Sequence, residues 1–175
     1  EPKTGLKGNL ISSYETHNTF DNNILFSYKK NNFYSSFFFN NYSSDGYDLI
    51  EDDGLNTVNK FKTNTLQIKL GHNLGESLKI KINARYYTQL IDNIAPNSLT
   101  GETFTSEDNI NFTISHKSEK IRTDFEVYFT SYFGDEFLDD EQGDRFSESF
   151  YDHILLKPEI KTVYKINKQK EFVFG

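Results

Sequence analysis

Apolar and polar residues alternate along most of this chain in segments of about ten residues. The clearest alternation is in residues 62–72, where Leu66, Ile68 and Leu70 are each flanked by polar or small neighbours. A period of two predicts a β-strand, because successive side chains of a strand point to opposite faces. No segment shows a competing helical period, and we therefore expect an all-β chain.

The same pattern predicts eight strands and the start of a ninth. They cover residues 6–14, 20–28, 33–42, 62–72, 77–88, 108–116, 121–132 and 150–164, and the last segment is 171–175. Soluble sheets usually have strands of about five or six residues, whereas a tilted strand needs roughly nine to eleven residues to cross a bilayer. The lengths favour strands that span a membrane.

Short and long connections alternate between the predicted strands. Short turns rich in Lys and Asn are expected near residues 30, 74, 118 and 167, and long loops at 43–61, 89–107 and 133–149; the loop at 15–19 is the exception. This alternation is typical of membrane barrels with short periplasmic turns and long extracellular loops. The sequence thus predicts an antiparallel up-and-down transmembrane β-barrel segment.

Composition limits the function further. The 175 residues include no Cys, which excludes disulfide and thiolate chemistry, and their formal net charge of -7 argues against a nucleic-acid partner. No stretch approaches 18 apolar residues, so a transmembrane helix is not expected. The mean hydropathy of -0.67 is compatible with a barrel, because only alternate strand residues face lipid.

Charged residues alternate with the apolar ones on the predicted inward faces of the strands. Eight strands could close a small barrel by themselves, but its lumen would have to pair these charges almost completely. A wide barrel that is filled with water or closed by a plug avoids this requirement. The residues concerned are Lys79, Lys81, Arg85, Arg122, Asp124, Glu126, Lys157, Glu159 and Lys161.

No arrangement of residues points to catalysis. The four His residues are dispersed along the chain, and the sequence contains no Gly-x-Ser-x-Gly motif, no P-loop and no His-Glu-x-x-His motif. We therefore expect a binding or transport protein rather than an enzyme.

Acidic residues gather in the predicted loop 133–149. Carboxylate oxygens are ligands that Ca²⁺ prefers, although the spacing here does not fit an EF-hand loop. One hypothesis is a calcium site, and the other is a solvated loop surface that faces lipopolysaccharide. The candidate calcium ligands are Asp135, Glu136, Asp139, Asp140 and Asp144.

Several segments resemble the barrel strands of TonB-dependent outer-membrane receptors. The first barrel strands of this family are similar to Gly5-Leu6-Lys7-Gly8 through Tyr14, to Asn18-Thr19-Phe20, and to Tyr42-Ser43-Ser44-Asp45-Gly46-Tyr47-Asp48. The stretch from Lys157-Pro158-Glu159-Ile160 to Gly175 looks like the approach to another hairpin of the same barrel. The element Asp45-Gly46-Tyr47 is the most specific part of the resemblance.

The resemblance implies a 22-stranded barrel in the Gram-negative outer membrane, closed by an N-terminal plug domain. Such receptors import scarce ligands, such as iron chelates, haem, cobalamin or glycans, with energy delivered through TonB. Residues 1–175 would be a partial barrel domain without the plug. The implied partners are outer-membrane lipid and lipopolysaccharide, TonB through the plug, a surface lipoprotein, and a small-molecule or glycan ligand. Some cobalamin-type receptors of this family bind calcium through loop aspartates.

Aromatic residues at the strand ends are candidates for ligand contacts at the mouth of the barrel. They are Tyr47, Tyr87, Tyr132 and Phe133. Aromatic rings at strand ends also suit an interfacial girdle. Two other functions remain open at this point: a porin or adhesin-type outer-membrane barrel, and a soluble β-sandwich binding module, since any antiparallel sheet with one wet face alternates in this way.

Overall fold

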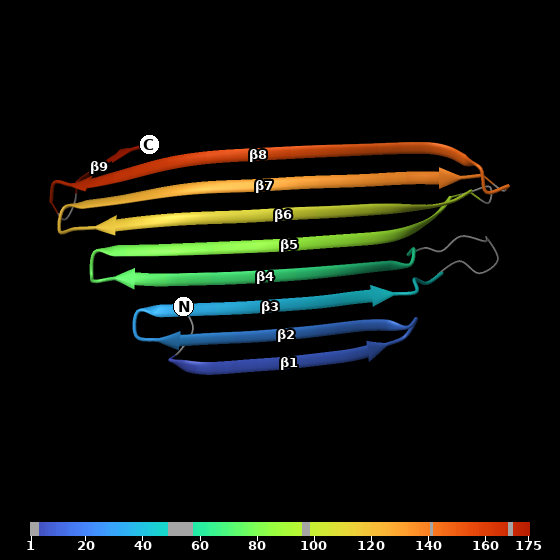
Figure 1. Cartoon of the computed structure of the whole chain (residues 1–175), viewed down its shortest axis with the longest axis horizontal. Coiled ribbons are helices and arrows are strands. Elements are labelled where there is room, and N and C mark those ends of the chain that lie inside the picture. The colour runs from blue at the N-terminus through green and yellow to red at the C-terminus, as the bar shows by residue number, and fades with distance from the viewer. Residues whose placement is uncertain (1–3, 49–57, 96–98, 141, 168–169) are drawn as a thin grey trace.

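The protein forms one antiparallel sheet of nine strands that follow one another in sequence order (Figure 1). The computed structural model describes residues 4–48, 58–95, 99–140, 142–167 and 170–175. Every regular element in these ranges is a strand, and none of them contains a helix that could span a membrane. The strands are β1 (Gly5–Glu15), β2 (Thr19–Lys30), β3 (Phe33–Ser44), β4 (Phe61–Leu74), β5 (Leu78–Ala95), β6 (Leu99–Lys117), β7 (Ile121–Asp139), β8 (Arg145–Lys165) and β9 (Glu171–Phe174).

The structure confirms the all-β, up-and-down sheet and the nine predicted strands, but two predicted loops are wrong. Residues 89–107 and 133–149 belong mostly to strands, because β5 and β6 pair as far as Ala95 and Leu99, and β7 and β8 pair as far as Asp139 and Arg145. Backbone hydrogen bonds form the ladder whatever the side chains are. The polar residues that suggested loops lie on the paired ends of these strands.

The connections lie at the two ends of the sheet, and the predicted alternation of short and long connections is wrong: all but the one between β3 and β4 join strands that are separated by five residues or fewer. The short turns near residues 31, 75, 118 and 167 lie together at the left in Figure 1, and the other connections lie at the right. Asn31 and Gly75 have positive φ angles of 51° and 71°, which Asn and Gly tolerate better than other residues. In the connection between β3 and β4, Tyr47 and Val58 form an isolated bridge. We call the end with the turns near residues 31, 75, 118 and 167 the short-turn end, and the opposite end the long-strand end.

Successive hairpins are staggered in one direction. At the short-turn end, Phe33 is the first residue of β3 and lies opposite His72 on β4. The β4–β5 ladder extends two residues beyond His72, to Leu74. The β6–β7 ladder ends one residue beyond that level, and the β8–β9 ladder two residues beyond it again. Five residues over six strands correspond to a strand tilt of about 30°, at roughly 3.3 Å per residue and 4.8 Å between strands. A stagger of constant sign is what a sheet needs in order to curve into a barrel.

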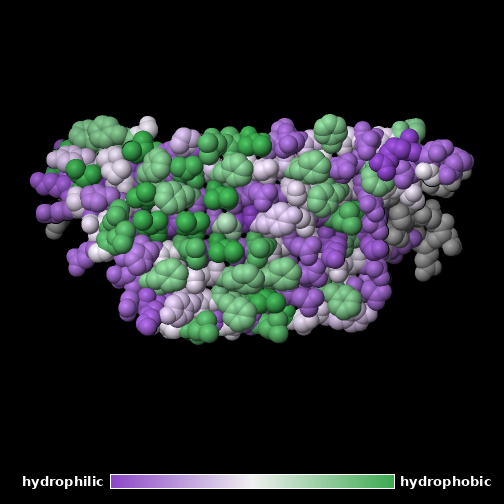
Figure 2. All heavy atoms as spheres, viewed as in Figure 1, coloured by the Kyte–Doolittle hydropathy of each residue, from purple (hydrophilic) through white to green (hydrophobic). Residues whose placement is uncertain are grey.

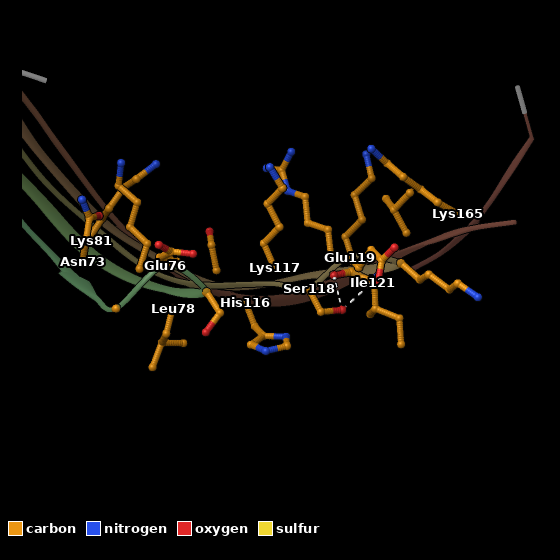
Figure 3. Close-up of a pocket in the computed structure, with 18 of the residues that line it drawn as sticks. Asn73, Glu76, Leu78, Lys81, His116, Lys117, Ser118, Glu119, Ile121 and Lys165 are labelled. Carbon is orange, nitrogen blue, oxygen red and sulfur yellow. Dashed lines mark hydrogen bonds between the residues drawn. The ribbon is translucent and has the colours of Figure 1, made fainter. Parts of the chain in front are cut away.

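The two faces of the sheet differ in chemistry. Figure 3 shows the sheet curving around Lys81, Lys117 and Lys165, with Leu78 and Ile121 on the outer side. The concave face is therefore the polar one. The convex face carries a continuous group of apolar residues, which we call the apolar band: Leu6, Leu10, Ile24, Phe26, Phe37, Phe39, Leu66, Ile68, Leu70, Leu78, Ile80, Ile82, Ala84, Tyr86, Ile110, Phe112, Ile114, Phe125, Val127, Phe129, Leu156 and Ile160.

The apolar band has a defined height. On β5 it runs from Leu78 to Tyr86, which corresponds to about 27 Å along the strand, or about 23 Å after correction for the tilt. Figure 2 shows hydrophobic residues over the centre and the short-turn side of one face, with hydrophilic residues gathered at both ends. Toward the long-strand end the band stops at a row of polar residues that lie opposite one another: Ser12, Asn22, Asn41, Asn64, Thr88 and Ser106.

Side-chain hydrogen bonds connect much of this polar row. The Ser12 hydroxyl donates to Asn22 Oδ1 at 2.6 Å, and the Asn41 amide donates to Asn64 Oδ1 at 2.8 Å. The Asn64 amide in turn donates to the Thr88 hydroxyl at 3.3 Å. On β1 to β6 the row therefore separates the apolar band from the strand ends, whereas at its level and beyond it the rings of Phe133 and Phe104 lie 6.4 Å apart on the same face.

No second layer covers the sheet within the described residues. Tyr34 is the one apolar side chain there that is buried, with 9% of its surface exposed, whereas Leu10 is 72% exposed and Leu156 is 63% exposed. The sheet is also open, since β1 and most of β8 have one unpaired edge. The interior that would normally bury these residues is thus absent from the described part of the chain, and the apolar band needs another environment.

Two small residues make room for aromatic rings that lie across the concave face. Tyr34 is opposite Gly71, and a Cβ atom built on Gly71 would come within 2.0 Å of Tyr34 Cζ. Tyr151 is opposite Gly134 in the same way, with a separation of 2.2 Å from Tyr151 Cε2. The ammonium group of Lys79 lies 5.5 Å from the centre of the Tyr34 ring. These glycines allow each ring to pack flat on the neighbouring strand.

Candidate ligand-binding site

Aromatic and charged side chains meet on the concave face toward the long-strand end. Tyr87 on β5 lies opposite Glu107 on β6, Glu107 lies opposite Tyr132 on β7, and Tyr132 lies opposite His153 on β8. Since residues that lie opposite one another share a face, this row projects from four adjacent strands to the same side. We call this row, with the residues that contact it, the tyrosine cluster.

Arg85 joins one end of the tyrosine cluster to its acidic centre. Its guanidinium group lies 5.3 Å from the centre of the Tyr87 ring and 3.7 Å from Glu107 Oε2. The other Glu107 oxygen accepts a hydrogen bond of 2.7 Å from the Asn109 amide, and Tyr128 donates one of 2.5 Å to Asn109 Oδ1. Because both carboxylate oxygens have partners, Glu107 is held in one orientation beside the Tyr87 ring.

A stacked pair of tyrosines forms the other end of the cluster. The rings of Tyr132 and Tyr151 are nearly parallel, at an interplanar angle of 5°, with centroids 5.8 Å apart. Gly134, directly opposite Tyr151, leaves the space in which the Tyr151 ring lies. The stack presents aromatic faces and hydroxyl groups side by side.

Titration of Tyr151 reports on this stack. Tyr132, its nearest ionisable neighbour, raises the pKa of Tyr151, and partial desolvation and Glu136 act in the same direction. We expect Tyr132→Phe to lower the pKa of Tyr151 toward its ordinary value near 10, because the neighbouring hydroxyl is removed while the ring remains. NMR of tyrosine ¹³Cζ during alkaline titration measures this pKa. An unchanged pKa of Tyr151 in the variant would contradict the stacked geometry.

The structure brings together two of the four predicted aromatic contact residues. Tyr87 and Tyr132 belong to the tyrosine cluster, but Phe133 points to the convex face, where its ring lies 6.4 Å from that of Phe104. Tyr47 lies in the connection after β3, 5.3 Å from the His17 ring. Tyr132 and Phe133 are neighbours in β7 and point to opposite faces, so ligand contact by Phe133 stays a prediction that the tyrosine cluster does not include.

Several members of the tyrosine cluster were not predicted as ligand contacts. They include Glu107, His153, Tyr151 and Arg85. Glu107 fell at the end of the predicted loop 89–107, and Tyr151 at the start of the predicted strand 150–164. Extending the period of two through these segments would have placed both on the face of Tyr87.

The five candidate calcium ligands lie on a strand end and a tight turn. Asp135 and Glu136 are consecutive in β7 and point to opposite faces. Asp139 Oδ1 is paired with Arg145 Nε at 3.0 Å, and Asp140 Oδ1 accepts hydrogen bonds from the backbone N–H groups of Gln142 and Asp144. Across the described residues, no group of three or more such side chains is arranged to hold a metal ion. Calcium binding stays a prediction.

The tyrosine cluster combines flat aromatic surfaces with a guanidinium group, a carboxylate and amide groups. Aromatic faces pack against the apolar faces of sugars and planar ligands, and the polar groups fix hydroxyls by hydrogen bonds. The side chains are held by neighbouring strands rather than by loops. This arrangement is suited to ligand binding.

No protein-family model matches the chain, and a search of curated proteins finds no match.

Proposed function

We propose that this chain is a sector of the wall of an outer-membrane β-barrel, and that the barrel is an active-transport receptor of the TonB-dependent type. In this proposal the apolar band contacts lipid, the concave face lines the lumen, and the tyrosine cluster contributes to ligand capture. The short-turn end is periplasmic and the long-strand end extracellular.

The observation that carries the membrane part of the proposal is the apolar band. It crosses eight strands of the sheet, and its height of about 23 Å is close to the roughly 25 Å of the outward apolar band in membrane barrels. It is uncovered in the described residues, although it contains some of their largest apolar side chains. A soluble protein rarely exposes a continuous apolar surface of this extent.

The concave face supports a wide lumen. Ion pairs join Arg122 to Asp124 at 2.9 Å and Lys157 to Glu159 at 2.8 Å. Lys81 and Lys117, in contrast, have no salt bridge within the described residues. Unpaired charges need water, and a narrow closed lumen leaves little room for it. A large barrel such as that of a transport receptor provides the space.

Growth and uptake measurements test the transport role. We expect deletion of the gene to abolish growth when one scarce ligand is supplied as the sole source of iron, cobalamin or carbon. Uptake of that ligand is expected to stop when the inner-membrane proton gradient is collapsed with an uncoupler. Unimpaired growth of the deletion strain on each of the iron, cobalamin and carbon sources tested would contradict the proposal.

The alternative function is a porin or adhesin-type barrel, which has the same apolar band. Its distinguishing result is uptake that continues at the same rate after addition of the uncoupler, or no uptake at all. A soluble binding module would instead remain monodisperse without detergent, and this behaviour would remove both membrane functions.

A further inference from the structure

A groove on the concave face at the short-turn end carries the opposite charge to the chain as a whole. It lies over β4 to β9, far along the strands from the tyrosine cluster, and has a volume of about 900 Å³ (Figure 3). Seven cationic and three acidic side chains line it, whereas the chain has a net charge of -7. This size is within the usual range of small-molecule sites, roughly 300–1,000 Å³.

The cations of this groove point to the same side of the sheet. Figure 3 shows Lys81, Lys117 and Lys165 rising on the concave side from different strands. Among the described residues, the ammonium groups of these three lysines have no salt bridge or hydrogen bond. Their charge is therefore available to a ligand.

Like charges also lie directly against one another in the groove. Lys117 on β6 is opposite Arg122 on β7. Directly opposed like charges weaken an antiparallel pair, and the one carboxylate bound to Arg122 is that of Asp124. An anion between Lys117 and Arg122 would offset this repulsion.

Neutral donors surround the cations. Ser115 and Asn73 line the same groove and can donate hydrogen bonds to oxygen atoms. The three acidic residues that line the groove, Glu76, Glu119 and Glu171, lie in or next to the short turns and are outnumbered by the cations. The combination of several cations with hydroxyl and amide donors matches a multivalent oxyanion.

We propose that this groove is a binding site for a small ligand that carries several oxyanion charges, as phosphate or carboxylate groups. The site is separate from the tyrosine cluster, and it does not depend on whether the convex face contacts lipid. Because cations predominate in the lining of the groove, we expect it to bind an anion in preference to a cation or a neutral sugar.

Calorimetry of the purified full chain tests the proposal, with tripolyphosphate and propane-1,2,3-tricarboxylate as probes. We expect saturable binding that weakens as NaCl increases. The double variant Lys81→Gln/Lys117→Gln should raise the Kd by about tenfold or more, since each lost charge-assisted hydrogen bond contributes substantially to binding. Tighter binding of tripolyphosphate would assign phosphate groups, and tighter binding of the tricarboxylate would assign carboxylates; each result supports the site.

The matched control is Lys7→Gln/Lys69→Gln, which removes two charges from the same face outside the groove. Its Kd should change by less than about twofold. The variant Lys81→Arg/Lys117→Arg keeps the charge and should keep binding, which separates loss of charge from misfolding. Absence of binding at millimolar probe, or equal losses in the two double glutamine variants, would overturn the proposal.

Discussion

Replacing Ile82 with Arg is expected to destabilise the protein in a bilayer by about 2–4 kcal/mol, the cost of a cationic side chain near the bilayer midplane. Ile82 lies near the middle of the apolar band, between Leu70 on β4 and Phe112 on β6. The free energy of unfolding by urea, measured for the protein inserted in liposomes, gives this cost directly.

The matched control for this change is Ser36→Arg. Ser36 lies at nearly the same level along the strands but on the concave face, opposite Ser27 and Lys69. Its substitution should cost less than about 1 kcal/mol, because the new charge enters water. Ile82 is 38% exposed in the sheet by itself, so in the absence of lipid contact its replacement should cost no more than the control. Equal costs of Ile82→Arg and Ser36→Arg would therefore contradict lipid contact by the apolar band.

Replacing Gly71 with Val is expected to cost about 1–3 kcal/mol, because the new side chain collides with the ring of Tyr34. The Cβ position is 2.0 Å from Tyr34 Cζ and 2.3 Å from Tyr34 Cε1. Gly71 does not have a positive φ angle, so the penalty is steric rather than conformational. The same liposome unfolding experiment measures it.

A double-mutant cycle isolates the contact between the ring and residue 71. In a Tyr34→Ala background, Gly71→Val should cost little, because the space above residue 71 is empty and Val favours strands. Gly75→Ala is the comparison variant: Gly75 has a φ of +71° and nothing within 4 Å of its Cβ position, so its cost should be independent of Tyr34. An equal cost for Gly71→Val in both backgrounds would refute the packing described here.

The alternation of side chains was sufficient to predict the class of fold and the polarity of its faces. Leu66, Ile68 and Leu70 lie together on the convex face as expected, and Lys79 and Lys81 lie on the concave face. Period two is a local property, and each strand displays it without reference to its neighbours. The strand count and the short turns followed from the same signal.

The extent of the strands and the composition of the candidate site could not be predicted in the same way. Strand ends outside the apolar band, such as Thr103 opposite Glu136, carry polar residues on both faces and lose the alternating signal. The tyrosine cluster depends on register, because Tyr87 and Tyr132 come from strands separated by β6. A slip of two residues would keep each ring on its face but change the side chains that meet, and the sequence alone does not fix the register to that precision.

The most direct test of lipid contact by the convex face is a nitroxide scan of residues 78–86 in the protein reconstituted in bilayers. The chain has no Cys, so single-cysteine variants carry one label each. Collision with oxygen, which concentrates in lipid, should be highest at the even positions from Leu78 to Tyr86, and collision with a water-soluble nickel complex should be highest at the odd positions from Lys79 to Arg85. Equal access of the nickel complex to even and odd positions would contradict a membrane-spanning wall.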